Sequence, residues 1–122
     1  MPILEVEVVL RPGEALPAGL AQELADCAGN IFGSTPGGTW VKVRALAGEQ
    51  YAENGGAPQG VYPVVVSVLK ARLPPAGTMQ AEISGLTALI AWACARPPEN
   101  VHIVYQPAGR GRVAFGGKLI QE

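Results

Sequence analysis

The chain has 122 residues, of which 48% are hydrophobic and only 16% are charged, and its formal net charge is −1. This length suits one hydrophobic core, so we expect a single domain over residues 1–122. The small net charge and the absence of a basic run argue against nucleic acid as a partner. No apolar segment has the length of a membrane-spanning helix, and no signal peptide is recognisable, so we expect a cytoplasmic protein without a membrane partner.

The first half of the chain predicts a strand, a helix and a second strand. An apolar run over residues 2–10 ends in an Arg-Pro-Gly breaker, which is typical of a strand. Apolar residues then recur at helical spacing from Leu16 to Ile31, and the segment Gly33–Gly38 ends that helix. Side chains alternate over Trp40–Leu46, which predicts the second strand.

The second half predicts the same order of elements. Residues Val61–Ala71 form an apolar run with hydrophobic side chains on both faces, as expected for a sheet that is covered on both sides. Thr78 is the predicted N-cap of a helix that two prolines end after Arg96. The fourth predicted strand is Val101–Tyr105.

The two halves are related by a constant offset. Pro2 and Pro63 are 61 positions apart, and so are four further pairs of identical residues. We therefore predict a pseudo-repeat of residues 1–60 and 61–122, each a βαβ unit. Right-handed crossovers place both helices on one face of a four-stranded mixed sheet, which is an α/β (α+β) fold. The opposite face is expected to be covered by other subunits of a closed oligomer.

Pro2 is a candidate general base. Removal of Met1 would leave Pro2 with a secondary amine at the head of a buried strand. A free α-amino group titrates at about 8, and an apolar environment lowers its pKa by disfavouring the charged form. Pro63 occupies the matching position, but its nitrogen is a tertiary amide and accepts no proton. The alternative reading of Pro2 is structural, because proline is tolerated at the first position of a strand.

Met1-Pro2 leading a strand, the tandem βαβ units and the tail segments 100–105 and 113–117 together resemble the tautomerase superfamily. The similarity is to the branch of macrophage migration inhibitory factor and 5-carboxymethyl-2-hydroxymuconate isomerase. It implies a homotrimer with a central barrel and active sites between subunits. It also implies a cofactor-independent tautomerase (isomerase) in which Pro2 moves a proton in an enol or dienol keto acid that carries a carboxylate. We expect no cofactor and no metal.

Four further residues are candidate substrate-binding groups. Lys70 and Arg72 share a face at the end of the third strand, and Arg72 has the geometry to hold a carboxylate through two parallel hydrogen bonds. By the resemblance, His102 stands where this branch carries a pocket tyrosine. A short strand starting at Arg112 is implied to join the neighbouring subunit's sheet, so that Arg110 or Arg112 reaches that subunit's pocket. The structural alternative is solvated strand-end cations and a histidine held by its neighbours.

Two other functions follow from the same residues. A protonated Pro2 would act as a general acid in a hydratase or decarboxylase of a small unsaturated acid, although only Glu53 and Glu122 stand out as candidates to activate water. The other alternative is a trimeric binding module without catalysis.

Overall fold

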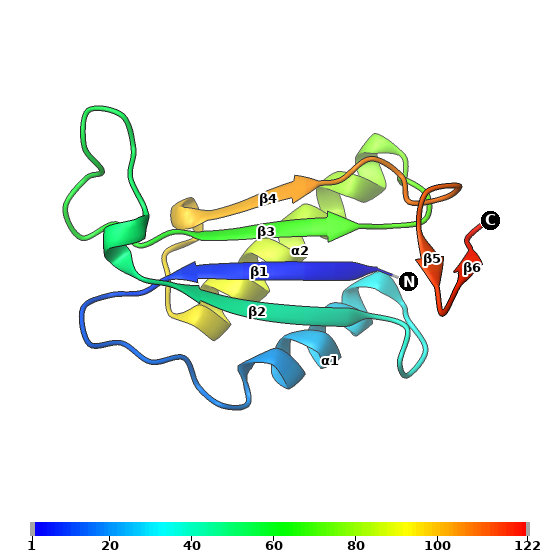
Figure 1. The fold of residues 1–122 in the computed structure, drawn as a ribbon, viewed down its shortest axis with the longest axis horizontal. Helices are drawn as coiled ribbons and strands as arrows, with labels where there is room; N and C mark the ends of the chain where they lie inside the picture. The colour runs from blue at the N-terminus through cyan, green and yellow to red at the C-terminus, as the bar shows by residue number, and fades with distance from the viewer. Residues whose placement is uncertain (1, 122) are drawn as a thin grey trace.

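The computed structural model describes residues 2–121, and Met1 and Glu122 lie outside the described residues. A four-stranded mixed sheet carries two long helices on one side, as Figure 1 shows with the sheet toward the viewer. The elements in chain order are β1 (Ile3–Val9), α1 (Leu20–Phe32), β2 (Trp40–Leu46), the short helix η1 (Gly48–Gln50), β3 (Val64–Leu69), α2 (Ala76–Cys94), the short helix η2 (Pro98–Asn100), β4 (Val101–Tyr105), β5 (Ala114–Phe115) and β6 (Lys118–Leu119).

The strands lie in the order β2-β1-β3-β4, which confirms the two tandem βαβ units. β1 pairs in parallel with β2, β3 pairs in parallel with β4, and the two central strands are antiparallel. Both parallel pairs have the same register, because Ile3 lies opposite Trp40 and Val64 lies opposite Val101. The first residues of β3 and β4 thus follow those of β1 and β2 by the same 61 positions.

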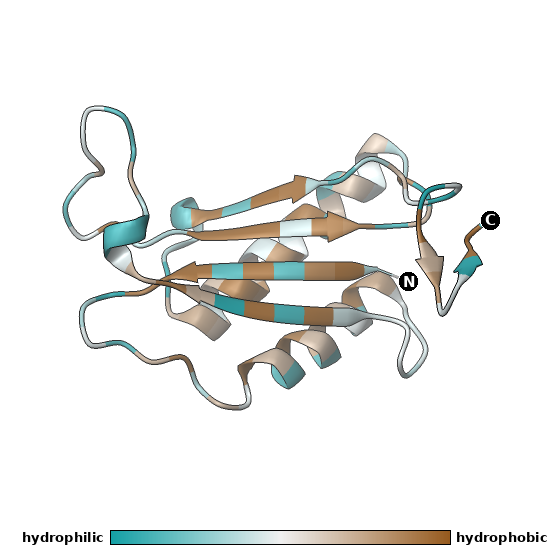
Figure 2. Cartoon of the chain, in the orientation of Figure 1, coloured by the Kyte–Doolittle hydropathy of each residue, from teal (hydrophilic) through white to brown (hydrophobic). Residues whose placement is uncertain are grey.

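The core lies between the sheet and the helices. Successive strand residues point to opposite faces, so every second side chain of the central strands faces the helices. The largest fully buried side chains of the core come from β1, β3 and the two helices: Leu4, Val6, Val8, Val64, Val66, Val68, Leu24, Leu86 and Ile90. Figure 2 shows the resulting alternation of hydrophilic and hydrophobic residues along β1 and β2.

The face of the sheet away from the helices is uncovered in the single chain. Glu5 and Lys42 form an exposed ion pair on it, at 2.6 Å. β3 and β4 instead present Val65 and Val104, with 38% and 53% of their surfaces exposed. The predicted bare face is therefore present, and it mixes charged with apolar side chains.

The two long helices begin at other residues than the sequence predicts. Thr78 is not the N-cap of the second helix: α2 starts at Ala76, after Pro75, whose extended backbone precedes the first turn. A proline fixes its own φ and is tolerated where a helix begins, so the helix needs no side-chain cap here. The first helix likewise starts later than predicted, at Leu20, although Leu16 still packs against the core.

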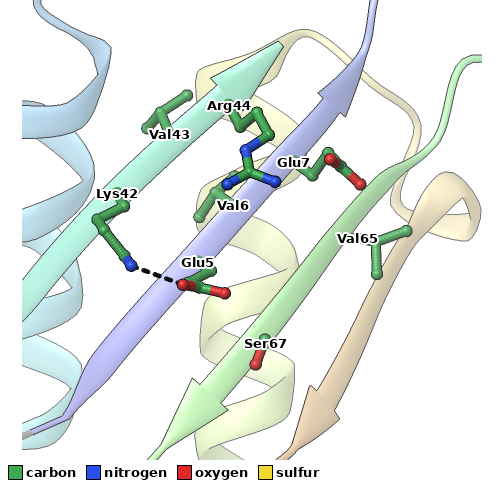
Figure 3. A pocket seen from close by; sticks show the side chains of 8 residues that line it. All are labelled: Glu5, Val6, Glu7, Lys42, Val43, Arg44, Val65 and Ser67. Carbon is green, nitrogen blue, oxygen red and sulfur yellow. Dashed lines mark ion pairs between the residues drawn. The ribbon is translucent and has the colours of Figure 1, made fainter. Parts of the chain in front are cut away.

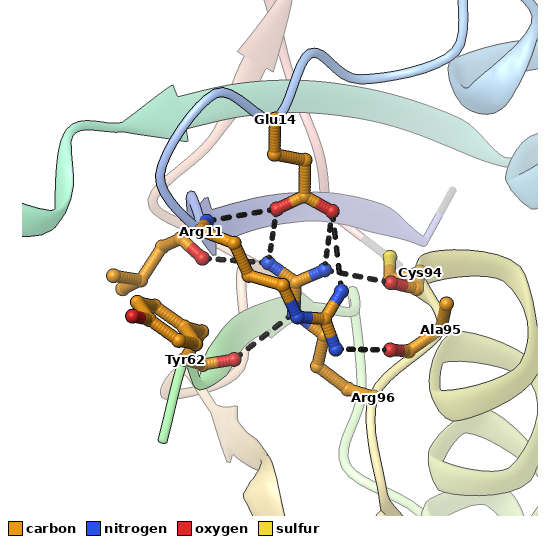
Figure 4. Close-up of polar contacts among 7 residues, drawn as sticks. Arg11, Glu14, Tyr62, Cys94, Ala95 and Arg96 are labelled. Atoms are coloured by element: carbon orange, nitrogen blue, oxygen red, sulfur yellow. Dashed lines mark hydrogen bonds and ion pairs between the residues drawn. The ribbon is translucent and has the colours of Figure 1, made fainter. Parts of the chain in front are cut away.

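A buried arginine joins four segments at the end of the sheet where β1 finishes (Figure 4). Only 1% of the Arg96 side chain is exposed, and its guanidinium donates two hydrogen bonds to the Glu14 carboxylate, both at 2.7 Å. It also donates to the backbone carbonyls of Val9, Tyr62 and Cys94, at 2.7, 3.0 and 2.9 Å. Arg96 was predicted only to lie at the end of a helix, whereas the structure shows that it holds β1, the loop before α1, and the segments flanking β3 and α2 together.

Glu14 is the acidic centre of this cluster. Hydrogen bonds from Arg96, together with the backbone N–H of Arg11, lower the pKa of Glu14 from 4.5 to about 2. Arg11 donates a further hydrogen bond to the carbonyl of Ala95, which ends α2 in a left-handed conformation. The carboxylate is thus charged over the whole neutral range and balances a cation that has almost no contact with water.

Within residues 2–121, no helix has the length and hydrophobicity needed to cross a membrane.

We predict that Glu14→Gln lowers the free energy of unfolding by about 3 kcal/mol at pH 7, because it leaves the buried charge of Arg96 without its partner. The contribution of Glu14 is fully present above about pH 4.5 and is lost as the pH falls toward 2, because its pKa is depressed in the folded state. Urea unfolding at fixed protein concentration, from pH 7 down to pH 2.5, measures the difference between the two proteins. Glu23→Gln, at an exposed position of α1, is the control. A difference that stays constant with pH would contradict the role of Glu14.

Candidate active site

A pocket of about 560 Å³ lies where β1 begins and β3 ends. Because these strands are antiparallel, Ile3 lies opposite Leu69, and the residues on either side of that pair converge. The C-terminus of α1 closes the third side. The lining residues are Pro2, Phe32, Gly33, Ser34, Lys70, Ala71 and Arg72. The fold therefore brings together three of the five predicted site residues.

Pro2 is buried at the head of β1. Its carbonyl oxygen accepts a hydrogen bond from the backbone N–H of Trp40 at 3.0 Å, so the residue is held against the start of β2. Met1, whose removal would free the Pro2 amine, lies outside the described residues.

Lys70 is paired inside its own chain. Its Nζ donates to Glu82 Oε2 at 2.8 Å, and the two side chains are only 19% and 10% exposed. The same ammonium lies 5.0 Å from the centre of the Phe32 ring, within the range of a cation–π interaction. The sequence predicted Lys70 as a substrate-binding cation, but its charge is matched by Glu82.

Tyr105 completes this cluster from β4. Its hydroxyl donates to the second oxygen of Glu82, Oε1, at 2.7 Å. Burial, and then the hydrogen bond to the Glu82 carboxylate, raise the pKa of Tyr105, so it remains a neutral donor. Tyr105 therefore packs on the helix side of the sheet.

Arg72 differs from Lys70 in having no partner among residues 2–121. The residue is exposed at the pocket wall, and among residues 2–121 its guanidinium makes no hydrogen bond and no ion pair. A planar, permanently charged guanidinium that is free on one side of a pocket is well suited to a carboxylate. Ser34 adds a hydroxyl that shares a hydrogen bond with Thr39 at 2.6 Å.

His102 lies away from this pocket within the single chain. It is paired with Val65 near the start of β4, and Val65 is opposite Glu7 on β1, so His102 is at the other end of the sheet from Pro2. Its side chain is exposed on the bare face. The parallel pairing of β3 with β4 causes this separation, because both strands end, rather than begin, beside the pocket. A role for His102 stays a prediction about a site shared between subunits.

Arg112 is also separate from the Pro2 pocket. It contributes to a neighbouring hollow on the other side of β1 and β3, together with Ile3 and Gln106. Its guanidinium donates to the carbonyls of Pro107 and Ala108 at 2.8 and 3.0 Å and so braces its own loop. The strand predicted to start here begins two residues later and pairs with β6 of the same chain.

A second hollow, of about 370 Å³, lies on the bare face of the sheet (Figure 3). Charged side chains of β1 and β2 surround it, and the hydrogen bond from Lys42 lowers the pKa of Glu5. Arg44 extends over β1 on the same face as Glu7. Lys42, whose strand position would suit it to bind a carboxylate, is thus paired with Glu5.

Within residues 2–121, no three His, Cys, Asp or Glu side chains are grouped to hold a metal ion.

Two residues of the site were not predicted. Phe32 lines the pocket because α1 ends beside the end of β3, and Glu82 reaches Lys70 because α2 passes there. For Glu82 the sequence does carry a signal, because it is the only charged residue in the 19 residues of α2. A single acidic residue in an otherwise uncharged helix is expected to have a cationic or hydrogen-bonding partner where it is buried.

No family model matches the sequence, and no curated protein matches it. Solved structures do. A fused 4-OT described as an asymmetric trimer has 18% identity and a TM-score of 0.79, over 96% of this chain and 94% of that chain. Pt0534, inactivated by 2-oxo-3-pentynoate, has 16% identity and a TM-score of 0.76, over 96% and 95%. The macrophage migration inhibitory factor of Trichinella spiralis has 13% identity and a TM-score of 0.72, over 97% and 99%.

These identities are low, and what the comparisons establish is the fold. The chain has the fold of 4-oxalocrotonate tautomerase and macrophage migration inhibitory factor structures over nearly its whole length. The predicted tautomerase-like architecture is therefore confirmed.

Proposed function

We propose that the chain is a cofactor-independent tautomerase (isomerase) that uses the amine of Pro2, freed by removal of Met1, to move a proton in an enol or dienol keto acid. The observation that carries this proposal is the placement of buried Pro2 in one pocket with Arg72, which has no partner among the described residues. The tautomerase fold adds support. A binding module would need neither the buried position of the proline nor its proximity to Arg72.

In the proposed reaction the neutral amine is the base. It accepts the proton of the enol hydroxyl while the carbonyl double bond forms, and the electron pair of the carbon–carbon double bond takes a proton at carbon. The protonated amine supplies that proton, so the enzyme returns to its starting state. Such a shuttle needs an amine whose pKa is near the working pH and a donor for charge on the substrate oxygen.

Arg72 is the proposed anchor for the substrate carboxylate. Its guanidinium would form two parallel hydrogen bonds and fix the keto acid with its reacting carbon toward Pro2. The positive charge of Arg72 also favours the neutral form of the amine, and so does the burial of Pro2. Both effects lower the pKa of Pro2 and favour the base over the general acid that a hydratase or decarboxylase would require.

We further propose that the protein works as a homotrimer. Fused 4-OT structures of this fold are described as trimers. In this chain the bare sheet face presents Val65 and Val104, and closing it against neighbours would remove this apolar surface from water. A neighbour's His102 and Arg112 are then candidates to complete the pocket.

Sedimentation analysis at micromolar concentration tests the assembly. We expect a mass equal to three chains of 12.6 kDa. Val104→Asp should dissociate the trimer, because it places an unpaired charge on a covered face, whereas Gln22→Asp on the outer surface of α1 should leave it intact. A wild-type protein that sediments as a monomer would contradict the proposed assembly.

The base is tested by hydrogen–deuterium exchange at C3 of 2-oxopentanoate, followed by NMR, since this exchange requires proton abstraction next to the carbonyl. Intact mass should show loss of Met1. Pro2→Ala should slow the exchange at least about 100-fold, the lower end of what a positioned acid–base group contributes. Pro12→Ala, in the loop after β1, should leave the rate unchanged. Retention of Met1 in an active protein, or equal rates for Pro2→Ala and wild type, would refute the proposal.

A further inference from the structure

We propose that Glu82 sets the charge of the Pro2 pocket, so that the pocket selects 2-keto acids with one carboxylate over those with two. This inference rests on the proposed function for the location of the ligand and concerns which ligand the site accepts. Glu82 does not line the pocket, so its role would be that of a positioning residue acting through Lys70.

The Lys70 ammonium is fixed by contacts on two sides. Glu82 Oε2 accepts its hydrogen bond at 2.8 Å, and the Phe32 ring lies 5.0 Å from it. The Glu82 side chain is 10% exposed, and Tyr105 holds its other oxygen at 2.7 Å. If Lys70 turned toward a ligand, it would leave a largely buried carboxylate without its counter-charge, which is unfavourable.

The charged residues that line the pocket indicate which class of ligand it accepts. Among residues 2–121, two cations line the pocket, Lys70 and Arg72, and no acidic residue does. Glu82 cancels the charge of Lys70, whereas among residues 2–121 Arg72 has no partner. The pocket therefore offers one uncompensated positive charge, and one guanidinium pairs with one carboxylate. A second carboxylate would lose part of its hydration without gaining a cation in return.

Two five-carbon acids provide a matched pair of probes. 2-Oxopentanoate and 2-oxoglutarate share the keto-acid end and differ in a terminal methyl group against a terminal carboxylate. Their dissociation constants would be measured by NMR titration at pH 7 with the full chain after Met1 removal. We expect the wild type to bind 2-oxopentanoate more tightly than 2-oxoglutarate, and Arg72→Met to weaken both.

Glu82→Gln is the decisive variant. Glutamine keeps an oxygen for the Tyr105 hydroxyl but releases the charge of Lys70 to the pocket. The ratio of the two dissociation constants should shift about tenfold toward 2-oxoglutarate, as expected for one new charge-assisted hydrogen bond. In the double variant Lys70→Met/Glu82→Gln, which removes both charges, the ratio should return to the wild-type value.

The ratio separates this role from a structural one, because loss of packing weakens both acids alike and leaves their ratio unchanged. A tenfold wild-type preference for 2-oxoglutarate, an unchanged ratio in Glu82→Gln, or no binding of either acid at millimolar concentration would overturn the inference. Pro2→Ala should keep the wild-type ratio, because binding needs no proton transfer. The expected ratio shift in Glu82→Gln, together with no C3 exchange by the wild-type protein, would refute the tautomerase and leave the charge selection standing.

Discussion

The antiparallel pairing of β1 with β3 is the constraint on which the candidate site depends. It sets Ile3 opposite Leu69 and thereby brings the start of one strand to the end of the other. Pro2 comes from the first of these positions, and Lys70 and Arg72 from the second. A slip of one residue would exchange the two faces of the strand, burying glutamates of β1 and exposing its core valines. The alternation that builds the core therefore also holds the site in register.

The three cations most involved in this structure have different surroundings, and their surroundings determine their roles. Arg96 is almost fully buried, and its interactions with Glu14 and three backbone carbonyls hold one end of the sheet. The Lys70 side chain is 19% exposed, and Glu82 neutralises its charge. Arg72 is exposed and, among the described residues, unpaired. Only a cation of the last kind can give its charge to a ligand without uncovering a buried carboxylate.

Most of the fold could be predicted from local patterns. Trp40–Leu46 and Val101–Tyr105 were predicted with the bounds that the structure has, because alternation and flanking breakers mark a strand within its own sequence. Pro2, Lys70 and Arg72 were also predicted as candidate site residues from their chemistry and strand positions, but their convergence in one pocket depends on the antiparallel pairing of β1 with β3. Contacts between distant elements were not: Lys70 and Glu82 meet only because α2 packs beside the end of β3. The end of the sheet at which His102 lies depends likewise on the pairing of β3 with β4.

Pro2 is the proposed base of the pocket that it shares with Arg72, and titration of its amine tests this proposal most directly. The pH dependence of kcat/KM for C3 exchange reports the pKa of the essential group in the free enzyme. If Pro2 is the base, the rate rises with pH through a pKa clearly below the value of about 8 of an ordinary α-amino group, and then levels. A rate that falls as the amine loses its proton, or one that rises only above pH 8, would contradict the assignment of Pro2 as a base with a lowered pKa.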